Sequence, residues 1–371
     1  MSPTPTQPSV LILGNHPSSS HSMHRFADTL ARAYHSRGWT VVRRAPRARV
    51  SRHVRNRALA KFAAYVENLV VFPVSVAVAV RRSQSVHLAD HSNALWLLVF
   101  PRRRATIVTC HDLIAVRAGL GEMPEHRTRW TGRVYQRLVL RGLGRAEAIH
   151  SVSHATATDI TRLVGAAATT VHLPVVAHDA GQPVLAGPYL LIVSSSGWRK
   201  RRDRAVEVWR RLRDTPAGAG LRLGVVGPAL TARELGESAD LTEYITTLRD
   251  IDDATLFATY AGARALLQVS RYEGFGWPIV EANTVGTPAI CTDDEVFREV
   301  AGTAGMFIAE DLDLVDWTGL ARRLDAPETR EAAFANSKRF GFEQFADGIV
   351  AIAQATHEGG TPRQVFPRMP R

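Results

Sequence analysis

Short apolar segments alternate with longer segments of helical periodicity along most of the chain. A first series of strand-like segments occupies residues 9–14, 40–42, 85–89, 105–110, 148–152 and 170–173. A second series occupies residues 189–193, 221–226, 265–269 and 288–292. Helical patterns lie among them, at residues 24–37, 202–214, 253–261, 278–285 and 330–357. Alternation of this kind predicts mostly parallel sheets with helices on both faces.

The alternation breaks once, at residues 177–187, where His, Asp, Gly and Pro replace the apolar pattern. Such a break predicts a linker between two domains. We therefore expect an α/β fold of two doubly wound, Rossmann-like domains that face each other across a cleft. The expected boundaries are residues 1–180 for the first domain and 181–345 for the second, with a helix end and a tail at 346–371.

Cysteine content and apolar run lengths bear on the compartment. The 371 residues include two cysteines, Cys110 and Cys291, which fits a reducing compartment better than a disulfide scaffold. The longest apolar run, residues 69–80, contains Pro73 and is shorter than the roughly 20 residues of a membrane span. The N-terminus lacks the basic segment of a signal peptide. These features predict a cytoplasmic protein.

Charge is distributed unevenly. The net charge is +11, but residues 1–185 hold 24 Arg and Lys against 9 acidic residues, whereas residues 186–371 hold 22 against 26. Residues 43–61 contain eight basic side chains and no acid, and the apolar run 69–80 follows. Basic and apolar residues side by side favour an anionic membrane surface as a partner, with the protein peripheral on its inner face. A core helix and compositional arginine richness are the alternative.

Polar residues follow the predicted strands, where ligands bind in open α/β sheets. In the first half these residues are Asn15, His16, Asp90, His91, His111 and Asp112. In the second half they include Ser194, Ser195, Ser196, Lys200, Arg271 and Glu273. Two such half-sites would line the expected cleft with polar groups.

The segment from Arg271 to Ala282 carries the sharpest local signal. Gly274 and Gly276 allow a tight loop with exposed backbone N–H groups, and a proline at 278 suits a first helical position. A helix N-terminus is an anion site. Glu273 precedes the loop and Glu281 lies about one turn inside the helix. A diphosphate on the amides with a polyol on each side, as in a nucleotide sugar, fits this arrangement.

The same segment resembles the EGFGLPxxEA stretch of glycosyltransferase family 4, whose retaining members have the GT-B fold. Its two glutamates have the E-x7-E spacing of those enzymes. Other segments are similar to family motifs and occur in the right order: TCHDLI at 109–114, IHSVS at 149–153, WRK at 198–200 and VVGP at 225–228. The resemblance extends from about residue 10 to about residue 349 and is strongest over residues 253–308.

The resemblance implies a retaining transfer of a hexose of the mannose or glucose type from a nucleotide-diphosphate sugar to an acceptor hydroxyl, in cell-surface glycan or glycolipid synthesis. No cofactor is expected, and no metal is expected because no DxD-like acidic pair lies beside the proposed phosphate loop. The first domain would take the acceptor and the second the donor. The implied catalytic residues are Glu273 on the donor sugar, Lys200 on the diphosphate and His111 near the reacting carbon. The implied donor-binding residues are Ser195, Arg199, Gly274, Phe275, Gly276 and Glu281.

Three positions depart from the family pattern. Ser195 stands where many relatives have an arginine, so the second phosphate cation is missing or is supplied from elsewhere, for example by Arg199. His21 and Ser22 stand where many have two glycines, and His154 replaces a common acidic residue.

Several alternatives remain at this point. His91 and Asp112 are candidates on the acceptor side, with structural roles as the competing explanation. The acceptor could be a soluble small molecule, and a nucleotide-sugar epimerase would use the same donor site. The sequence pI near 10.4 would suit a nucleic-acid binder, but the basic residues are not interleaved with aromatics and no such motif occurs, so nucleic acid is not an expected partner. No G-x-G-x-x-G follows a strand, which disfavours an oxidoreductase.

Overall fold

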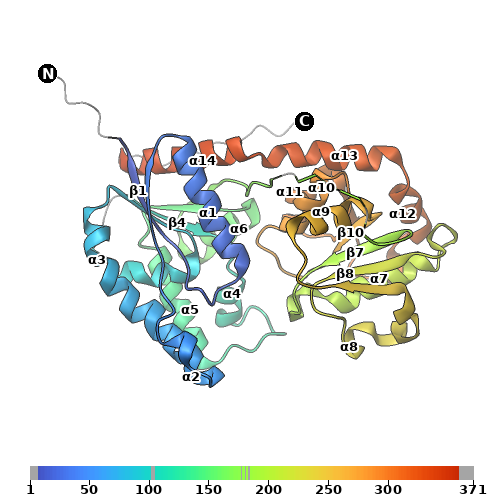
Figure 1. Ribbon diagram of the computed structural model, residues 1–371, viewed down its shortest axis with the longest axis horizontal. Coiled ribbons are helices and arrows are strands. Elements are labelled where there is room, and N and C mark those ends of the chain that lie inside the picture. The colour runs from blue at the N-terminus through green and yellow to red at the C-terminus, as the bar shows by residue number, and fades with distance from the viewer. Residues whose placement is uncertain (1–6, 102–104, 177, 180, 183, 359–371) are drawn as a thin grey trace. The chain divides into compact units, whose positions relative to one another are not determined.

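The computed structural model describes residues 7–101, 105–176, 178–179, 181–182 and 184–358. The chain divides into two compact units, the first formed by Met1–His172 with Phe342–Arg371 and the second by Leu173–Gly341. Each unit contains a six-stranded sheet flanked by helices (Figure 1). All strand pairings in both sheets are parallel, which confirms the predicted pair of α/β domains.

The sheet of the first unit has the strand order β2-β1-β3-β4-β5-β6. Its strands are β1 (Ser9–Leu13), β2 (Thr40–Arg44), β3 (Ser85–Leu88), β4 (Thr106–Cys110), β5 (Ala148–Ser151) and β6 (Thr169–Thr170). The order changes direction between β1 and β3, whose loops therefore diverge to opposite faces. A crevice at such a point is where open α/β sheets bind ligands.

The helices of the first unit are α1 (His21–Ser36), α2 (Arg57–Val66), α3 (Phe72–Arg82), α4 (Ile114–Leu120), α5 (Trp130–Leu143), α6 (His154–Val164) and α14 (Phe342–His357). The last of these returns from the end of the chain to pack on α1. Phe345 meets Phe26 with ring centroids 6.2 Å apart, and Arg37 bonds Glu343 and Asp347 at 2.8 and 2.7 Å. These contacts explain why the first unit includes the C-terminal helix.

The sheet of the second unit has the order β12-β11-β10-β7-β8-β9, which changes direction between β7 and β10. Its strands are β7 (Tyr189–Val193), β8 (Arg222–Val226), β9 (Ile245–Leu248), β10 (Ala265–Gln268), β11 (Ala289–Thr292) and β12 (Gly305–Ile308). Its helices are α7 (Arg202–Arg213), α8 (Ala232–Leu235), α9 (Asp253–Gly262), α10 (Trp277–Thr284), α11 (Glu295–Ala301), α12 (Trp317–Leu324) and α13 (Pro327–Ser337).

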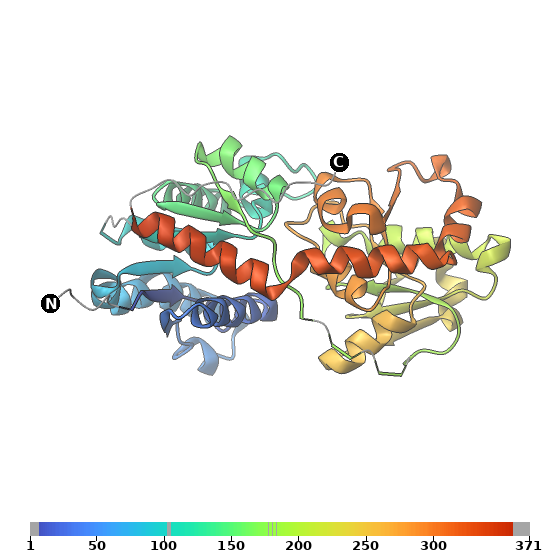
Figure 2. The ribbon, with the colours of Figure 1, turned by 90° about the horizontal axis from the view of Figure 1, so that it is seen from above.

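Two boundaries differ from the sequence-based expectation. The units divide at residue 172 rather than at 180, and the first unit regains the chain at Phe342 rather than at 346. The helical tail is also not continuous: α13 ends at Ser337, a 3-10 turn follows, and Gly341 is extended at φ −73° and ψ 149° before α14 begins (Figure 2). Phe340 in this break is buried against Phe275, with ring centroids 5.6 Å apart, and this contact holds the interruption in place.

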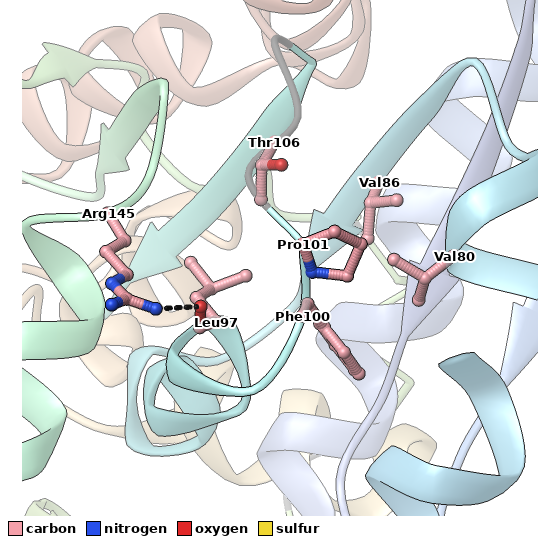
Figure 3. Close-up of a pocket in the computed structure, with 7 residues that line it drawn as sticks. All are labelled: Val80, Val86, Leu97, Phe100, Pro101, Thr106 and Arg145. Carbon is pink, nitrogen blue, oxygen red and sulfur yellow. Dashed lines mark hydrogen bonds between the residues drawn. The ribbon is translucent and has the colours of Figure 1, made fainter. Parts of the chain in front are cut away.

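A small cavity in the first unit is part of its core packing. Figure 3 shows its lining, which consists of Val80, Val86, Leu97, Phe100, Pro101, Thr106 and Arg145. The cavity volume is about 10 Å³, which is no more than one water requires. The Arg145 guanidinium donates to the carbonyl oxygens of Leu97 and Leu98 at 3.2 and 2.9 Å. This cavity is too small to be a ligand site.

A chain of buried polar side chains crosses the first sheet. The Tyr34 hydroxyl lies 2.9 Å from His87 Nδ1, and His87 Nε2 lies 2.9 Å from Thr109 Oγ1. Thr109 Oγ1 is 3.0 Å from His150 Nδ1, and His150 Nε2 is 2.8 Å from the carbonyl oxygen of Val171. A carbonyl can only accept, so His150 Nε2 donates. Because both rings are neutral, His150 Nδ1 accepts from the Thr109 hydroxyl, which in turn accepts from His87 Nε2. His87 Nδ1 then accepts from the Tyr34 hydroxyl.

The two histidines of this chain are held in the neutral form. Burial lowers the pKa of His150 to about 3 and lowers the pKa of His87 well below its ordinary value. Burial in an apolar sheet disfavours an imidazolium. The folded unit therefore binds these protons less readily than the unfolded chain does.

We expect the first unit to lose stability in mild acid. Below about pH 6.5 the two histidines are protonated in the unfolded chain, whereas His87 and His150 stay neutral in the folded unit. The free energy of unfolding should therefore fall by up to about 1.4 kcal/mol per pH unit for each histidine. The loss attributable to His150 should continue to about pH 3. Urea unfolding between pH 7.5 and 4.5 measures it. His150→Phe should start less stable and show a shallower slope; an equal slope would contradict this origin.

Candidate functional site

The candidate site of the second unit lies at the carboxyl ends of β7 and β10, where the strand order changes direction. The loop after β7 contains the exposed Ser195 and a 3-10 turn, Trp198–Lys200. The loop after β10 leads through Glu273 into α10. The two loops are tied together by the backbone, since Arg271 N donates to Arg199 O at 2.8 Å. The fold thus joins two segments that are about 70 residues apart in sequence.

Glu273 is the centre of this site. Lys200 Nζ lies 2.5 Å from its Oε1, and an Arg199 Nη1 atom lies 2.7 Å from its Oε2. The same arginine nitrogen donates to Tyr272 O at 2.9 Å. Gln268 Nε2, at the end of β10, lies 3.4 Å from Oε1. Two cations therefore converge on one carboxylate whose side chain is 9% exposed.

The ionised form of Glu273 survives burial because of these two cations. Burial alone would raise its pKa, but the charges and hydrogen bonds of Lys200 and Arg199 outweigh that effect and lower the pKa below its ordinary value. The carboxylate is thus an acceptor at neutral pH. With two cations and one anion, the cluster carries one excess positive charge, which is suited to an anionic ligand.

The loop after Glu273 reverses direction at a glycine and enters a helix. Gly276 has φ +96°, in the left-handed region, and lies directly before α10. An added side chain would be strained there, and its Cβ would lie 3.3 Å from Ile279 Cδ1. Pro278 occupies the first turn, where a missing N–H costs nothing. The predicted Gly274, Phe275 and Gly276 are all buried, so their backbones rather than side chains define the loop.

Glu281 lies inside α10 with its side chain buried. The Tyr260 hydroxyl donates to Glu281 Oε2 at 3.0 Å. Tyr260 comes from α9 and is completely buried, so it fixes the orientation of the carboxylate. The predicted role of Glu281 requires a carboxylate held in place, and Tyr260 is the residue that sequence reasoning missed.

A close backbone approach shapes the floor of the loop after β7. Gly227, after β8, has φ +130°, and an added Cβ would lie 2.3 Å from the carbonyl oxygen of Ser194. Only glycine fits there. Ser194 Oγ is buried and makes no hydrogen bond among the described residues. The sequence indicated Gly227 by its position directly after a strand. Gln268 was missed, although a polar residue at the end of a buried strand is a signal that could have found it.

The first unit has its own polar cluster where its strand order changes direction. Asn15 Nδ2, after β1, lies 2.5 Å from Asp90 Oδ2, after β3. His91 Nδ1 lies 3.3 Å from Asp90 Oδ1. Burial would raise the pKa of Asp90, but electrostatic interactions with His91 and His111, together with hydrogen bonds from the backbone N–H of Ser92 and from the Asn15 side chain, outweigh burial and lower the pKa. The cluster brings together the predicted Asn15, Asp90 and His91.

His16 extends this cluster toward Glu67, which lies in the π-helical turn between α2 and α3. Its Nδ1 lies 2.8 Å from Ser18 Oγ, and its Nε2 lies 3.2 Å from Glu67 Oε2. Glu67 also accepts from the backbone N–H groups of Arg49 and Val50 at 2.7 and 2.6 Å. Glu67 was not predicted, because its distance from His16 in sequence gives no local signal.

His111 and Asp112 both follow β4, and their surroundings differ. His111 Nε2 lies 2.9 Å from the carbonyl oxygen of Ala89, so that nitrogen carries the proton and Nδ1 is the basic one. Burial lowers the pKa of His111, and its ring meets Phe26 edge to face at 4.6 Å. Asp112 Oδ1 accepts from Ile114 N at 2.9 Å and so supports the start of α4. His21 and Ser22, which stand in place of glycines, begin α1.

Comparison with known proteins finds a family match within the second unit. Residues 177–326 match the family described as Glycosyl transferases group 1. O-antigen chain mannosyltransferase B of Escherichia coli is 33% identical over 115 residues, which are 30% of this chain and 30% of that protein. O-antigen chain mannosyltransferase RfbU of Salmonella typhimurium is 29% identical over 97 residues, 26% of this chain and 27% of that protein. The chain thus matches less than a third of the length of these relatives.

Solved structures share the architecture. Sucrose-phosphate synthase (tll1590) from Thermosynechococcus elongatus has a TM-score of 0.71 at 17% identity, covering 95% of this chain and 100% of that one. Anabaena Alr3699/HepE in complex with UDP-glucose has a TM-score of 0.66 at 13% identity, covering 94% and 99%. At these identities the likeness concerns the fold. The chain therefore has the predicted GT-B fold, and residues 177–326 match the glycosyl transferases group 1 family.

Proposed function

We propose that this protein is a retaining glycosyltransferase that moves a hexose from a nucleotide-diphosphate sugar to an acceptor hydroxyl without a metal ion. The observation that carries the proposal is the cluster of Lys200, Arg199 and Glu273, which lies at the switch point of a glycosyl transferases group 1 domain. Its excess positive charge suits a diphosphate, and its carboxylate suits sugar hydroxyls. A glycine loop and a helix N-terminus adjoin it.

Each residue has a distinct part in this proposal. Glu273 accepts hydrogen bonds from hydroxyls of the donor sugar while Arg199 keeps it ionised. Lys200 turns toward the diphosphate and neutralises the charge that grows on it as the bond to the sugar breaks. The backbone of Gly274, Phe275 and Gly276 approaches the diphosphate, and Glu281 takes the ribose hydroxyls. Ser195 offers a hydroxyl where many relatives have an arginine, so we assign the cationic role toward the diphosphate to Lys200 and the role of holding Glu273 to Arg199.

The first unit supplies the acceptor side. We assign His111 to the donor sugar near the reacting carbon, and His91 with Asp112 to the surroundings of the acceptor. A neutral imidazole such as His111 binds hydroxyls without carrying a charge of its own. No carboxylate is assigned as a nucleophile. We propose departure and attack on the same face of the sugar, guided by the leaving diphosphate, and this gives retention.

The names of the relatives support a proposal for the donor sugar and the acceptor. Two of them are mannosyltransferases of O-antigen chains, and one structural neighbour was solved with UDP-glucose. We therefore propose a hexose of the mannose or glucose type, and an acceptor glycan destined for the cell surface. We propose that this acceptor is anchored in a membrane and that the reaction takes place at the cytoplasmic face of an anionic bilayer.

Lys200→Ala should lower kcat by about 10²–10³. This corresponds to the roughly 2.7–4 kcal/mol that one stabiliser of developing charge contributes.

Glu281→Ala should mainly raise KM for the donor, because the ribose contact is the same in ground and transition states. UDP, GDP and their mannose and glucose esters are first ranked by the thermal shift they produce. Release of the nucleotide diphosphate then measures turnover.

Arg201→Ala is the matched control for Lys200→Ala. Arg201 is the next residue in the same basic run, but it pairs with the exposed Glu310 at 2.7 Å and not with Glu273. It should keep near-normal turnover. Equal turnover of Lys200→Ala and Arg201→Ala would contradict the placement of the diphosphate.

Transfer in excess EDTA should proceed at the untreated rate and should give a product with the anomeric configuration of the donor. NMR coupling constants of the product's anomeric proton, or of its anomeric carbon for a mannoside, report that configuration. Activity abolished by EDTA and restored by Mn²⁺ would contradict metal independence. An inverted anomer would contradict retention, and a changed sugar in the absence of acceptor would indicate an epimerase instead.

A further inference from the structure

The first unit carries one unusually long apolar helix. Helix α2, a π-helical turn (Glu67–Val71) and α3 form a continuous rod from Arg57 to Arg82, visible at the outer edge of this unit in Figure 1. The rod has 26 residues and a mean hydropathy of 1.8 in its most apolar stretch, of which 28% is buried. Among the described residues it is the one helix long and apolar enough to cross a membrane. The apolar run at residues 69–80 is only part of this rod.

One side of the rod belongs to the core of its own unit. Phe72, Val76 and Val80 are buried in the same hydrophobic cluster as residues of β1, β3 and β4. Glu67 is buried as well, and it holds the backbone of the preceding loop and the ring of His16. A helix committed to the core along one side does not cross a bilayer in this fold. It can only present its other side.

The other side is an apolar stripe open to solvent. Phe62 is 68% exposed, Val70 is 58% exposed and Val74 is 75% exposed. The apolar stripe consists of Leu59, Phe62, Val66, Val70, Val74 and Val78. Successive members are three or four residues apart, so they share a face. The π-helical turn holds one residue more than an α turn and thereby offsets the drift that a repeated spacing of four would cause.

Positive charge surrounds the apolar stripe. Exposed basic side chains precede and flank its first part at Arg52, Arg55, Arg57 and Lys61, and Arg81 and Arg82 follow its end. Between residues 43 and 82 the only acidic residue is Glu67, and its carboxylate is occupied by the hydrogen bonds described above. The surface therefore combines exposed apolar area with uncompensated positive charge.

A basic pocket adjoins the start of the rod. Its volume is about 530 Å³, and it is lined by Pro17, Pro46, Arg47, Ala48, Arg49 and Arg52. The backbone of Arg49 is fixed by Glu67 of the rod at 2.7 Å. Among the described residues, Arg47 and Arg49 form no ion pair with a carboxylate, so their guanidinium groups can bind phosphate.

We propose that the apolar stripe and this arginine pocket together dock the protein on an anionic bilayer, with the rod lying in the plane of the membrane and lipid phosphates bound by the arginines. Charge complementarity selects this occupant. Two copies of the chain packed stripe to stripe would bring their arginines together, whereas an anionic leaflet neutralises them and accepts the apolar side chains at the boundary of its acyl region. Phe62 and Tyr65 suit that boundary.

This inference deepens the proposed function, since it names the surface that meets the membrane, but it does not depend on donor chemistry. The residues of the apolar stripe lie in the first unit, and the donor-binding cluster lies in the second. The two can therefore fail separately. Loss of vesicle binding with an unchanged thermal shift by the nucleotide diphosphate would concern the docking surface alone.

The test is sedimentation of the full chain with vesicles of phosphatidylcholine alone or with about 30% phosphatidylglycerol, in about 0.1 and 0.5 M NaCl. We expect binding to the anionic vesicles at low salt and at least tenfold less at high salt or on neutral vesicles. Phe62→Asp/Val74→Asp should remove binding. Arg47→Gln/Arg49→Gln should lower it by about tenfold or more while the apolar stripe remains. Leu314→Asp, at an equally exposed leucine of the second unit, should bind as the wild type does.

Three outcomes would overturn the proposal. The wild type could stay in the supernatant under all conditions. The Phe62→Asp/Val74→Asp variant could sediment as the wild type does. The wild type could be a dimer by analytical ultracentrifugation that Phe62→Asp/Val74→Asp converts to a monomer, without vesicle binding by either, which would make the apolar stripe a contact between copies. Circular dichroism of each variant confirms that it is folded, and Arg47→Gln/Arg49→Gln, which changes exposed side chains only, tests the proposal if the aspartates unfold the unit.

Discussion

The candidate site of the second unit depends on keeping the buried carboxylate of Glu273 ionised. Removing a carboxylate from water costs several kcal/mol unless charge and hydrogen bonds replace the solvent. Here Lys200 and Arg199 do so from a loop that follows a different strand. The consequence is structural as well as chemical, because the loops after β7 and β10 must stay together for Glu273 to remain buried. In the proposed reaction, Lys200 turns to the diphosphate while Arg199 remains with the carboxylate.

Among the described residues, the first unit buries polar side chains in its sheet without ion pairs. Its sheet buries two histidines, a threonine and a tyrosine in one hydrogen-bonded chain, and each donor has an acceptor. Burial keeps His150 neutral, so the arrangement needs no counter-ion. A fully satisfied polar chain fixes the positions of neighbouring strands, and it holds β3, β4 and β5 beneath the loops that carry His91 and His111.

The same unit also exposes an apolar helix face to solvent. Its long helix buries Phe72, Val76 and Val80 and leaves an equally apolar face in solvent. Glu67 lies at the junction, in the π-helical turn, where it connects the helix to His16 and to the basic loop before it. A surface proposed to meet lipid is therefore joined by hydrogen bonds to the loop that follows β1.

The sequence by itself determined the two parallel α/β domains and the segment from Glu273 to Glu281, because strand and helix periodicity and the glycine-proline loop are local properties. It also placed Lys200 and His111 after their strands. Only the tertiary structure decided that Arg199 joins Lys200 on Glu273, that Tyr260 orients Glu281, and that the C-terminal helix belongs to the first unit. These contacts join residues far apart in the chain. The long helix shows the same limit of sequence analysis. Its apolar run is visible in the sequence, but which of its faces packs on the sheet depends on tertiary contacts, which a local pattern does not contain.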